Sequence, residues 1–143
     1  MVASTGGASV LPTSFVLRVG TDVQSVGEVA ALLERYGARY TRRLFTEHEL
    51  ATSGSQPRSA ERLAARFAAK EAVIKLLAPT RTVPPWRSIE VRTASSGAPS
   101  IELHDEAAEL ARERGVGAIS VSLTHGAGVG MATAVSLVTT DEG

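Results

Sequence analysis

The sequence predicts an α+β fold in which a long helix packs on a mostly antiparallel sheet. An apolar run near the start indicates a strand, an alanine-rich segment in the middle indicates the helix, and alternating apolar and polar residues in the second half indicate further strands. Because the later strands follow one another with short turns between them, hairpins are favoured over a doubly wound parallel sheet.

The first predicted elements are a strand and a helix. Residues 15–20 form a short apolar run typical of a buried strand, and Asp22 lies just beyond its end. In residues 25–36 apolar side chains recur at steps of three and four, which predicts a helix, and Gly37 is a suitable stop for it.

A second helix start is predicted at Thr46. Thr46 and Glu49 have the spacing of a capping box, in which each side chain accepts a hydrogen bond from the backbone N–H of the other. Residues 51–59 combine Ser, Gly and Pro, and this composition predicts a loop.

The long helix is predicted over residues 59–78. Ser59 is a suitable N-cap, alanine is abundant, and Pro79 ends the pattern. Glu71 and Lys75 lie beside an apolar stripe, in a column of alanines that we expect to leave space above the two charges. The stripe consists of Leu63, Phe67, Ile74 and Leu77.

The second half predicts strands interrupted by one short helix. Asp105 is a suitable cap for this helix, which we expect to stop at Gly115. The glycines at positions 126, 128 and 130 do not fit a dinucleotide-binding loop, since strand-like alternation follows them, and a hairpin turn accounts for them better. The predicted strand segments are residues 87–93, 101–103, 118–124 and 129–138.

Composition narrows the possible functions. The 143 residues hold 15 Lys and Arg and 15 Asp and Glu, and zero net charge argues against a general nucleic-acid binder or an electrostatic membrane binder. The lack of cysteine excludes disulfides and thiolate sites, and no apolar run approaches the roughly 20 residues of a membrane span. We expect a cytoplasmic enzyme or binding protein with a loose tail (1–13), a single domain (14–139) and a short C-terminal tail (140–143).

Asp22 and Glu71 are the candidate site residues that the pattern itself suggests. Two carboxylates from separate elements suit Mg²⁺, and Lys75, one turn from Glu71, is placed to neutralise a phosphoryl oxygen. Alternatives stay open at this point, because Glu71 and Lys75 also fit a surface pair and Asp22 also fits a turn or capping residue. The three histidines are far apart in sequence and do not have the spacing of a zinc site.

Five blocks of sequence together resemble the holo-(acyl carrier protein) synthases, the small 4′-phosphopantetheinyl transferases. The resemblance runs in order from about residue 16 to 138, and the RFAAKEA block beginning at Arg66 is the most specific part of it. The blocks are residues 19–23, residues 43–46 with Glu49, residues 65–75, residues 89–91 with 97–99, and residues 121–125.

The resemblance implies transfer of the 4′-phosphopantetheine arm of coenzyme A to a serine of a carrier protein, with release of adenosine 3′,5′-bisphosphate. It places Asp22 and Glu71 as Mg²⁺ ligands, Lys75 at the phosphates, and His125 at the phosphates or the water shell of the metal. Glu71, directly or through a metal-bound water, is the candidate base for the serine proton, with Asp22 as its competitor. A hairpin-turn His125 with no chemical role is the alternative for that residue.

The resemblance also implies a homotrimer with active sites shared between neighbouring subunits. Asp22 and Glu71 would then come from one chain, and the turn containing Gly97 and Pro99 would come from the next, together with His125. Three basic residues are further candidates for phosphate binding, with simple solvation as the alternative for the last two. They are Arg58, Arg66 and Lys70.

Two departures from the family pattern keep other functions open. Residues 76–81 replace a Gly-Thr-Gly turn, and the helix at residues 25–36 carries Glu28 and Glu34 where basic residues are usual. A non-catalytic protein that binds coenzyme A or a carrier is therefore one alternative, and a small trimeric protein with another ligand is a second. If the chain is an enzyme, the second departure favours a carrier from a specialised polyketide or peptide pathway over a typical acidic fatty-acid carrier.

Overall fold

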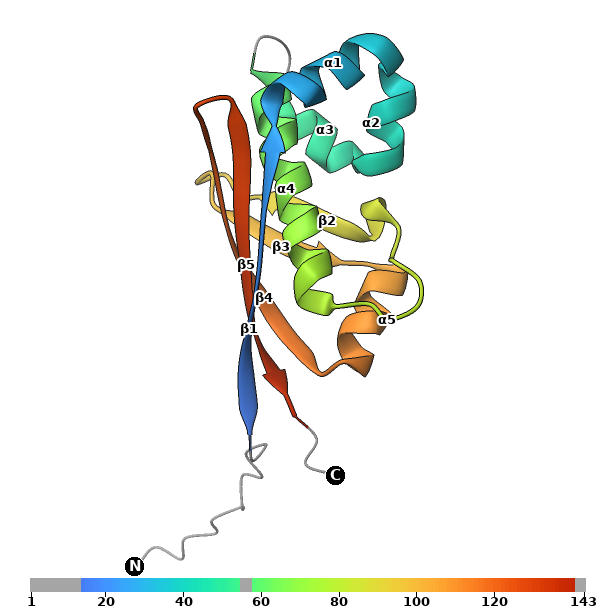
Figure 1. Cartoon of the computed structure of the whole chain (residues 1–143), viewed down its shortest axis with the longest axis vertical. Coiled ribbons are helices and arrows are strands. Elements are labelled where there is room, and N and C mark those ends of the chain that lie inside the picture. The colour runs from blue at the N-terminus through green and yellow to red at the C-terminus, as the bar shows by residue number, and fades with distance from the viewer. Residues whose placement is uncertain (1–13, 55–57, 141–143) are drawn as a thin grey trace, which may run out of the picture.

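The computed structural model describes residues 14–54 and 58–140, and they form the predicted α+β fold (Figure 1). Three antiparallel strands make one sheet, with the C-terminal strand in the middle, and two more strands pair as a separate antiparallel ribbon. The sheet contains β1 (Phe15–Ser25), β4 (Val116–Gly126) and β5 (Val129–Thr139), and the ribbon contains β2 (Ile89–Thr93) and β3 (Pro99–Leu103).

The helices are arranged around a long central one. α4 runs along one face of the three-stranded sheet and contacts β2 on its other side, while α1 to α3 gather near one end of α4 and α5 lies towards the other (Figure 1). No helix in the described parts of the chain is both long and apolar enough to cross a lipid bilayer. The helices are α1 (Val26–Tyr36), α2 (Ala38–Leu44), α3 (Glu47–Ser53), α4 (Ser59–Leu77), the 3₁₀ helix η1 (Trp86–Ser88) and α5 (Asp105–Glu113).

The predicted stop of α1 and the predicted start of α3 are confirmed. Gly37 has a positive φ and ends α1, where its N–H donates to the Leu33 carbonyl oxygen at 2.9 Å. At the start of α3, Glu49 Oε1 accepts from Thr46 N at 2.8 Å and Thr46 Oγ1 accepts from Glu49 N at 3.2 Å. These reciprocal bonds satisfy backbone donors that the first turn of a helix leaves free.

Several predicted boundaries are wrong. β1 continues to Ser25 because it pairs with β5 along its whole length, so Asp22 lies inside the strand. The expected loop at residues 51–59 is shorter, since α3 runs to Ser53 and Ser59 is already the first residue of α4. Asp105 starts α5 without a capping side-chain bond. The expected tails, 1–13 and 140–143, lie outside the described residues except for Thr140.

Small residues let α4 and the sheet approach closely. A Cβ atom at Gly20 of β1 would clash with the carbonyl oxygen of Ala72, and one at Gly130 of β5 would lie 2.5 Å from the amide nitrogen of Ala65. Ala64 and Ala68 belong to the alanine column that we expected to leave space above Glu71 and Lys75. Both are instead fully buried. The alanine column therefore brings the sheet into contact with the helix and so sets the height of β1 over Glu71 and Lys75.

The face of the three-stranded sheet that points away from α4 exposes apolar side chains. Strand alternation places every second residue on this face, including Thr21 and its partner Thr133. The exposed apolar residues are Phe15, Leu17, Val19 and Val23 from β1 and Met131 and Leu137 from β5. A group of exposed apolar side chains on one face of a folded chain is typical of an interaction surface.

Candidate active site

Asp22, Glu71 and Lys75 meet where β1 lies over α4. The Asp22 side chain is 15% exposed, and Lys75 Nζ lies 3.3 Å from its Oδ1. Lys75 also donates to the Thr21 carbonyl oxygen at 2.9 Å, and Gln24 Nε2 donates to Asp22 Oδ2 at 2.6 Å. The Asp22 carboxylate is therefore held in place from both sides.

Glu71 is half-buried beside this carboxylate. Partial burial raises the pKa of Glu71, the negative charge of Asp22 raises it further, and Lys75 opposes the rise. Two carboxylates close enough to repel each other are the donor set that a hard divalent cation such as Mg²⁺ prefers. The residues present therefore fit the metal that the sequence suggested for this place.

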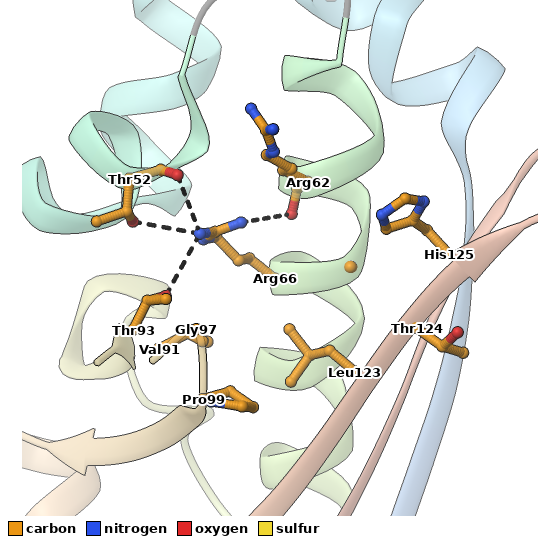
Figure 2. A pocket seen from close by; sticks show the side chains of 11 residues that line it. Thr52, Arg62, Arg66, Val91, Thr93, Gly97, Pro99, Leu123, Thr124 and His125 are labelled. Atoms are coloured by element: carbon orange, nitrogen blue, oxygen red, sulfur yellow. Dashed lines mark hydrogen bonds between the residues drawn. The ribbon is translucent and has the colours of Figure 1, made fainter. Parts of the chain in front are cut away.

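A second group of predicted residues lines a pocket of about 430 Å³ on another side of α4 (Figure 2). Arg66, Gly97, Pro99 and His125 all contribute to its wall. These residues come from α4, from the β2–β3 turn and strand, and from the end of β4. The structure thus brings together four of the residues that the resemblance selected from distant parts of the sequence.

Arg66 is the most constrained group in this pocket. Its side chain is almost buried, and its guanidinium donates to the carbonyl oxygen of Thr52 at 3.3 Å and to the carbonyl oxygen of Arg62 at 3.2 Å (Figure 2). The Nε atom is buried without a hydrogen-bond partner within the described structure. Burial lowers the pKa of Arg66, the Glu49 carboxylate raises it, and Arg62 lowers it. An anion bound in the pocket would offset the cost of burying the positive charge.

Arg62 is a pocket residue that the sequence reasoning missed. It lies one helical turn before Arg66, and its Nη1 donates to the Ser53 carbonyl oxygen at 3.1 Å. The spacing of four residues between the two arginines was the available signal, because residues i and i+4 share a helix face. Arg58, which we had selected instead, precedes the first turn of α4 and does not line the pocket.

His125 stands at the edge of the same pocket. The imidazole is about half exposed, and its Nδ1 lies 3.5 Å from Glu61 Oε2. The β4–β5 turn just beyond His125 is the predicted hairpin, with Ala127 and Gly128 both at positive φ. The turn therefore presents the imidazole next to the arginine pair.

Lys70 lies in the interior. Its ammonium is fully buried, 2.7 Å from Glu49 Oε1, and it donates to the carbonyl oxygens of Trp86 at 2.9 Å and Ile89 at 2.7 Å. These three acceptors use all three of its donors. Lys70 therefore has no donor left for a phosphate group.

A third polar cluster lies on the β2–β3 ribbon. Ligand atoms of Glu90, Glu102 and His104 all lie within 4.8 Å of one another, a spacing that a metal ion accepts. However, Arg92 already lies 3.2 Å from Glu90 and 3.6 Å from Glu102. Burial opposes the ionisation of Glu90, but hydrogen bonds from Thr46, His104 and Arg92 together lower its pKa to about 2. Arg92 supplies the positive charge here, so the cluster is a charge-compensated network.

Comparison with known proteins identifies the family. The family model of the 4′-phosphopantetheinyl transferase superfamily (ACPS) matches residues 18–128. This chain belongs to that superfamily.

Individual members of the superfamily align over most of both chains. Holo-(acyl-carrier-protein) synthase from Solibacter usitatus is 37% identical over 118 residues, 82% of this chain and 94% of the relative. The same enzyme from Streptomyces coelicolor is 40% identical over 122 residues, 85% of this chain and 97% of the relative. Among solved structures, the ACPS–CoA complex of Chronobacterium ammoniagenes superposes with a TM-score of 0.74 at 26% identity, covering 87% of this chain and 98% of that one.

Proposed function

We propose that this protein is a holo-(acyl carrier protein) synthase. It transfers the 4′-phosphopantetheine arm of coenzyme A to a serine of an acyl or peptidyl carrier protein and releases adenosine 3′,5′-bisphosphate. The observation that carries the proposal is the convergence of Asp22, Glu71 and Lys75, two acids and one cation, in a chain whose family performs this chemistry. The similarity to a CoA complex supports coenzyme A as the donor.

Asp22 and Glu71 would hold Mg²⁺, which when bound supplies positive charge to the pyrophosphate oxygens. Lys75, which is half exposed, is placed to turn from Asp22 towards the phosphates and stabilise their charge. In the reaction, the serine oxygen forms a bond to the β-phosphorus while the bond from that phosphorus to the bridging oxygen breaks. The serine proton passes to one of the two acids, with Glu71, directly or through a water, as the first candidate base and Asp22 as the second.

The pocket lined by Arg62, Arg66 and His125 would take the nucleotide end of coenzyme A. Its two guanidinium groups suit the 3′-phosphate, and Pro99 with Leu123 offers an apolar wall for the base. These assignments supply contacts that the missing Gly-Thr-Gly turn makes in relatives. The pocket also accounts for why His125 and the turn at Gly97 belong to one binding surface.

The active site would be shared between subunits of a homotrimer. Asp22, Glu71 and Lys75 do not line the nucleotide pocket of the same chain, although one ligand must reach both groups. Arg66 and Glu71 are five residues apart on α4, about 140° around the helix, so they point to different sides. The exposed apolar face of the three-stranded sheet supplies the surface for the subunit contact.

The test is the modification of an apo-carrier protein incubated with coenzyme A and Mg²⁺, followed by mass spectrometry. We expect the carrier to gain one phosphopantetheine group, Glu71→Gln and Asp22→Asn to abolish the gain, and Lys75→Ala to slow it by at least about tenfold. Glu106→Gln and Glu109→Gln on the exposed side of α5 are the matched controls and should retain full activity.

Two outcomes would contradict the proposal. Binding of coenzyme A without any mass change on the carrier would favour the non-catalytic alternative. Normal turnover by folded Glu71→Gln and Asp22→Asn would show that the chemistry takes place elsewhere in the molecule. The pathway of the carrier, the choice of Mg²⁺ and the cytoplasmic location stay predictions.

A further inference from the structure

The free edge of β2 is bound by side chains of α3. Within the described residues β2 pairs only with β3, so the N–H groups that it turns away from β3 lack a strand partner. Glu49 Oε2 accepts from Val91 N at 2.8 Å, and His48 Nε2 accepts from Thr93 N at 3.3 Å. Two consecutive residues of α3 therefore bind two alternate N–H groups of β2, on the edge where a third strand would pair.

The β2–β3 turn depends on the strand that leads into it. Thr93 is the last residue of β2, and residues 94–98 after it are all exposed. The hydrogen bonds of the turn are internal in the described structure, since Ala94 N donates to the Ala98 carbonyl oxygen and Gly97 N donates to the Ala94 carbonyl oxygen. A Cβ atom at Gly97 would meet no described atom within 4 Å. The position of the turn therefore depends on how the strand is held at Thr93.

Thr93 is the point at which the ribbon meets both α3 and α4. It lines the same pocket as Gly97 and Pro99 of the turn, and its Oγ1 lies 3.5 Å from Nη2 of Arg66 (Figure 2). The guanidinium thus contacts the side chain of Thr93, while the imidazole of His48 binds its backbone N–H.

α3 also positions the two arginines of the pocket. Arg66 donates to the carbonyl oxygen of Thr52, and Arg62 donates to that of Ser53. The Thr52 hydroxyl connects these contacts to His48, because it donates to the His48 carbonyl oxygen at 2.9 Å and accepts from Arg66 Nη2 at 3.2 Å. One short helix therefore sets the distance between the arginines and the turn.

We propose, on the basis of the function proposed above, that His48 is a positioning residue for the nucleotide end of coenzyme A. His48 does not itself line the pocket, so it acts through Thr93 and the turn. Its imidazole keeps Gly97 and Pro99 at the distance from Arg66 that the nucleotide requires. Loss of the acceptor leaves the Thr93 N–H without its partner and allows the strand end to move. The effect falls on nucleotide affinity and not on the transfer step.

The variants separate the acceptor atom from the space that His48 fills. His48→Phe is the test variant, because it keeps a ring without an acceptor, and His48→Leu replaces it if His48→Phe does not fold. His48→Gln is the rescue variant, because its amide oxygen is able to accept from Thr93 N. His104→Leu is the matched control, since His104 follows β3 at the opposite end of the ribbon, where its Nε2 lies 3.2 Å from Glu90 Oε1.

The experiment measures nucleotide binding and turnover separately. Binding of adenosine 3′,5′-bisphosphate and of coenzyme A is followed by calorimetry, and steady-state transfer to the apo-carrier is followed by mass spectrometry. His48→Phe should bind both compounds about three- to tenfold more weakly and raise the KM for coenzyme A by a similar factor. Its kcat and its KM for the carrier should change less than about twofold, and His48→Gln and His104→Leu should stay within about twofold of the wild type throughout.

Three outcomes would overturn the positioning role. These are unchanged nucleotide binding by the folded test variant, an equal loss in His48→Gln, and an equal loss in His104→Leu, because the last two would reflect a general loosening of the ribbon. A wild type that binds neither compound would overturn the nucleotide pocket and the role of His48 together. A wild type that binds both compounds without modifying the carrier would instead overturn the proposed function and leave the positioning result standing.

Discussion

Lys70 and Lys75 lie five residues apart on α4 but differ in exposure and in their partners. Lys75 is half exposed and contacts Asp22, while Lys70 is buried with three acceptors. The sequence placed Lys75 correctly beside Glu71 because the spacing of one helical turn fixes that relation. The sequence did not predict the burial of Lys70. Two of its acceptors are the backbone carbonyl oxygens of Trp86 and Ile89, and a pattern of side chains does not indicate where backbone carbonyls will lie.

Glu90 should link stability to acid pH. Its pKa is lowered to about 2, below the ordinary value of 4.5, so the ionised carboxylate favours the folded state above about pH 4.5 and this contribution is lost as the pH falls towards 2. We expect the urea midpoint of the wild type to fall between about pH 5 and 3, and that of Glu90→Gln to fall less.

Glu102 offers the matched control for this prediction. It contacts the same Arg92 but is 53% exposed, so Glu102→Gln should follow the wild-type fall. If Glu90→Gln lost as much stability on acidification as the wild type, the network around Glu90 would not be the origin of the effect.

At the scale of elements, α4 shows what an apolar pattern predicts and what it misses. The start, length and end of the helix are close to prediction, because propensity and Pro79 are local signals. The predicted stripe was too narrow, however, because sheet, ribbon and small helices bury α4 on almost every side. Gly20 and Gly130 permit this close contact, and only the pairing of β1 with β5 shows that both face the helix.

The buried pair of Glu49 and Lys70 should be the main polar link between elements. Glu49 caps α3 and also accepts from Val91 N of β2 at 2.8 Å, and Lys70 reaches it from α4. Lys70→Met would leave a buried carboxylate without its cation, and we expect it to cost about 3–5 kcal/mol in urea unfolding.

A second substitution separates charge from packing at this pair. Lys70→Met/Glu49→Gln should be less destabilised than the sum of the two single variants, since it leaves no unpaired charge. Lys75→Met, at an exposed pair on the same helix, should cost less than about 1 kcal/mol. A loss below 1 kcal/mol in Lys70→Met would contradict the linking role of the pair.

At the scale of the whole molecule, the candidate site divides into two groups that one chain keeps apart. Sequence order and family motifs selected both groups, including Gly97, Pro99 and His125, which the fold gathers around Arg66. The resemblance also implied that the two groups come from neighbouring subunits, and the five-residue spacing of Arg66 and Glu71 agrees with different sides of α4. Which side of the helix meets β1 and which meets β2 is specified only by the packed structure.

If the site is shared between subunits, two inactive variants should restore each other. Glu71→Gln lacks the carboxylate, and a double variant, Arg62→Ala/Arg66→Ala, lacks the cations of the nucleotide pocket. Mixed trimers contain sites in which an intact Glu71 from one subunit faces an intact pocket from its neighbour. Every trimer that contains both chains has one complete site among its three, so about a third of wild-type activity should return in the purified mixed trimers.

The mixing experiment is measured by carrier modification after co-expression of the two chains with separate tags and purification through both. A mixture of Glu71→Gln with Asp22→Asn is the control, because both residues belong to the same half of the site. Every site in these trimers then lacks either Glu71 or Asp22. Activity in the first mixture and none in the control would locate the two halves on different subunits. An inactive first mixture, with mixed trimers confirmed by both tags, would place the complete site within one chain and would require the nucleotide pocket to serve another purpose.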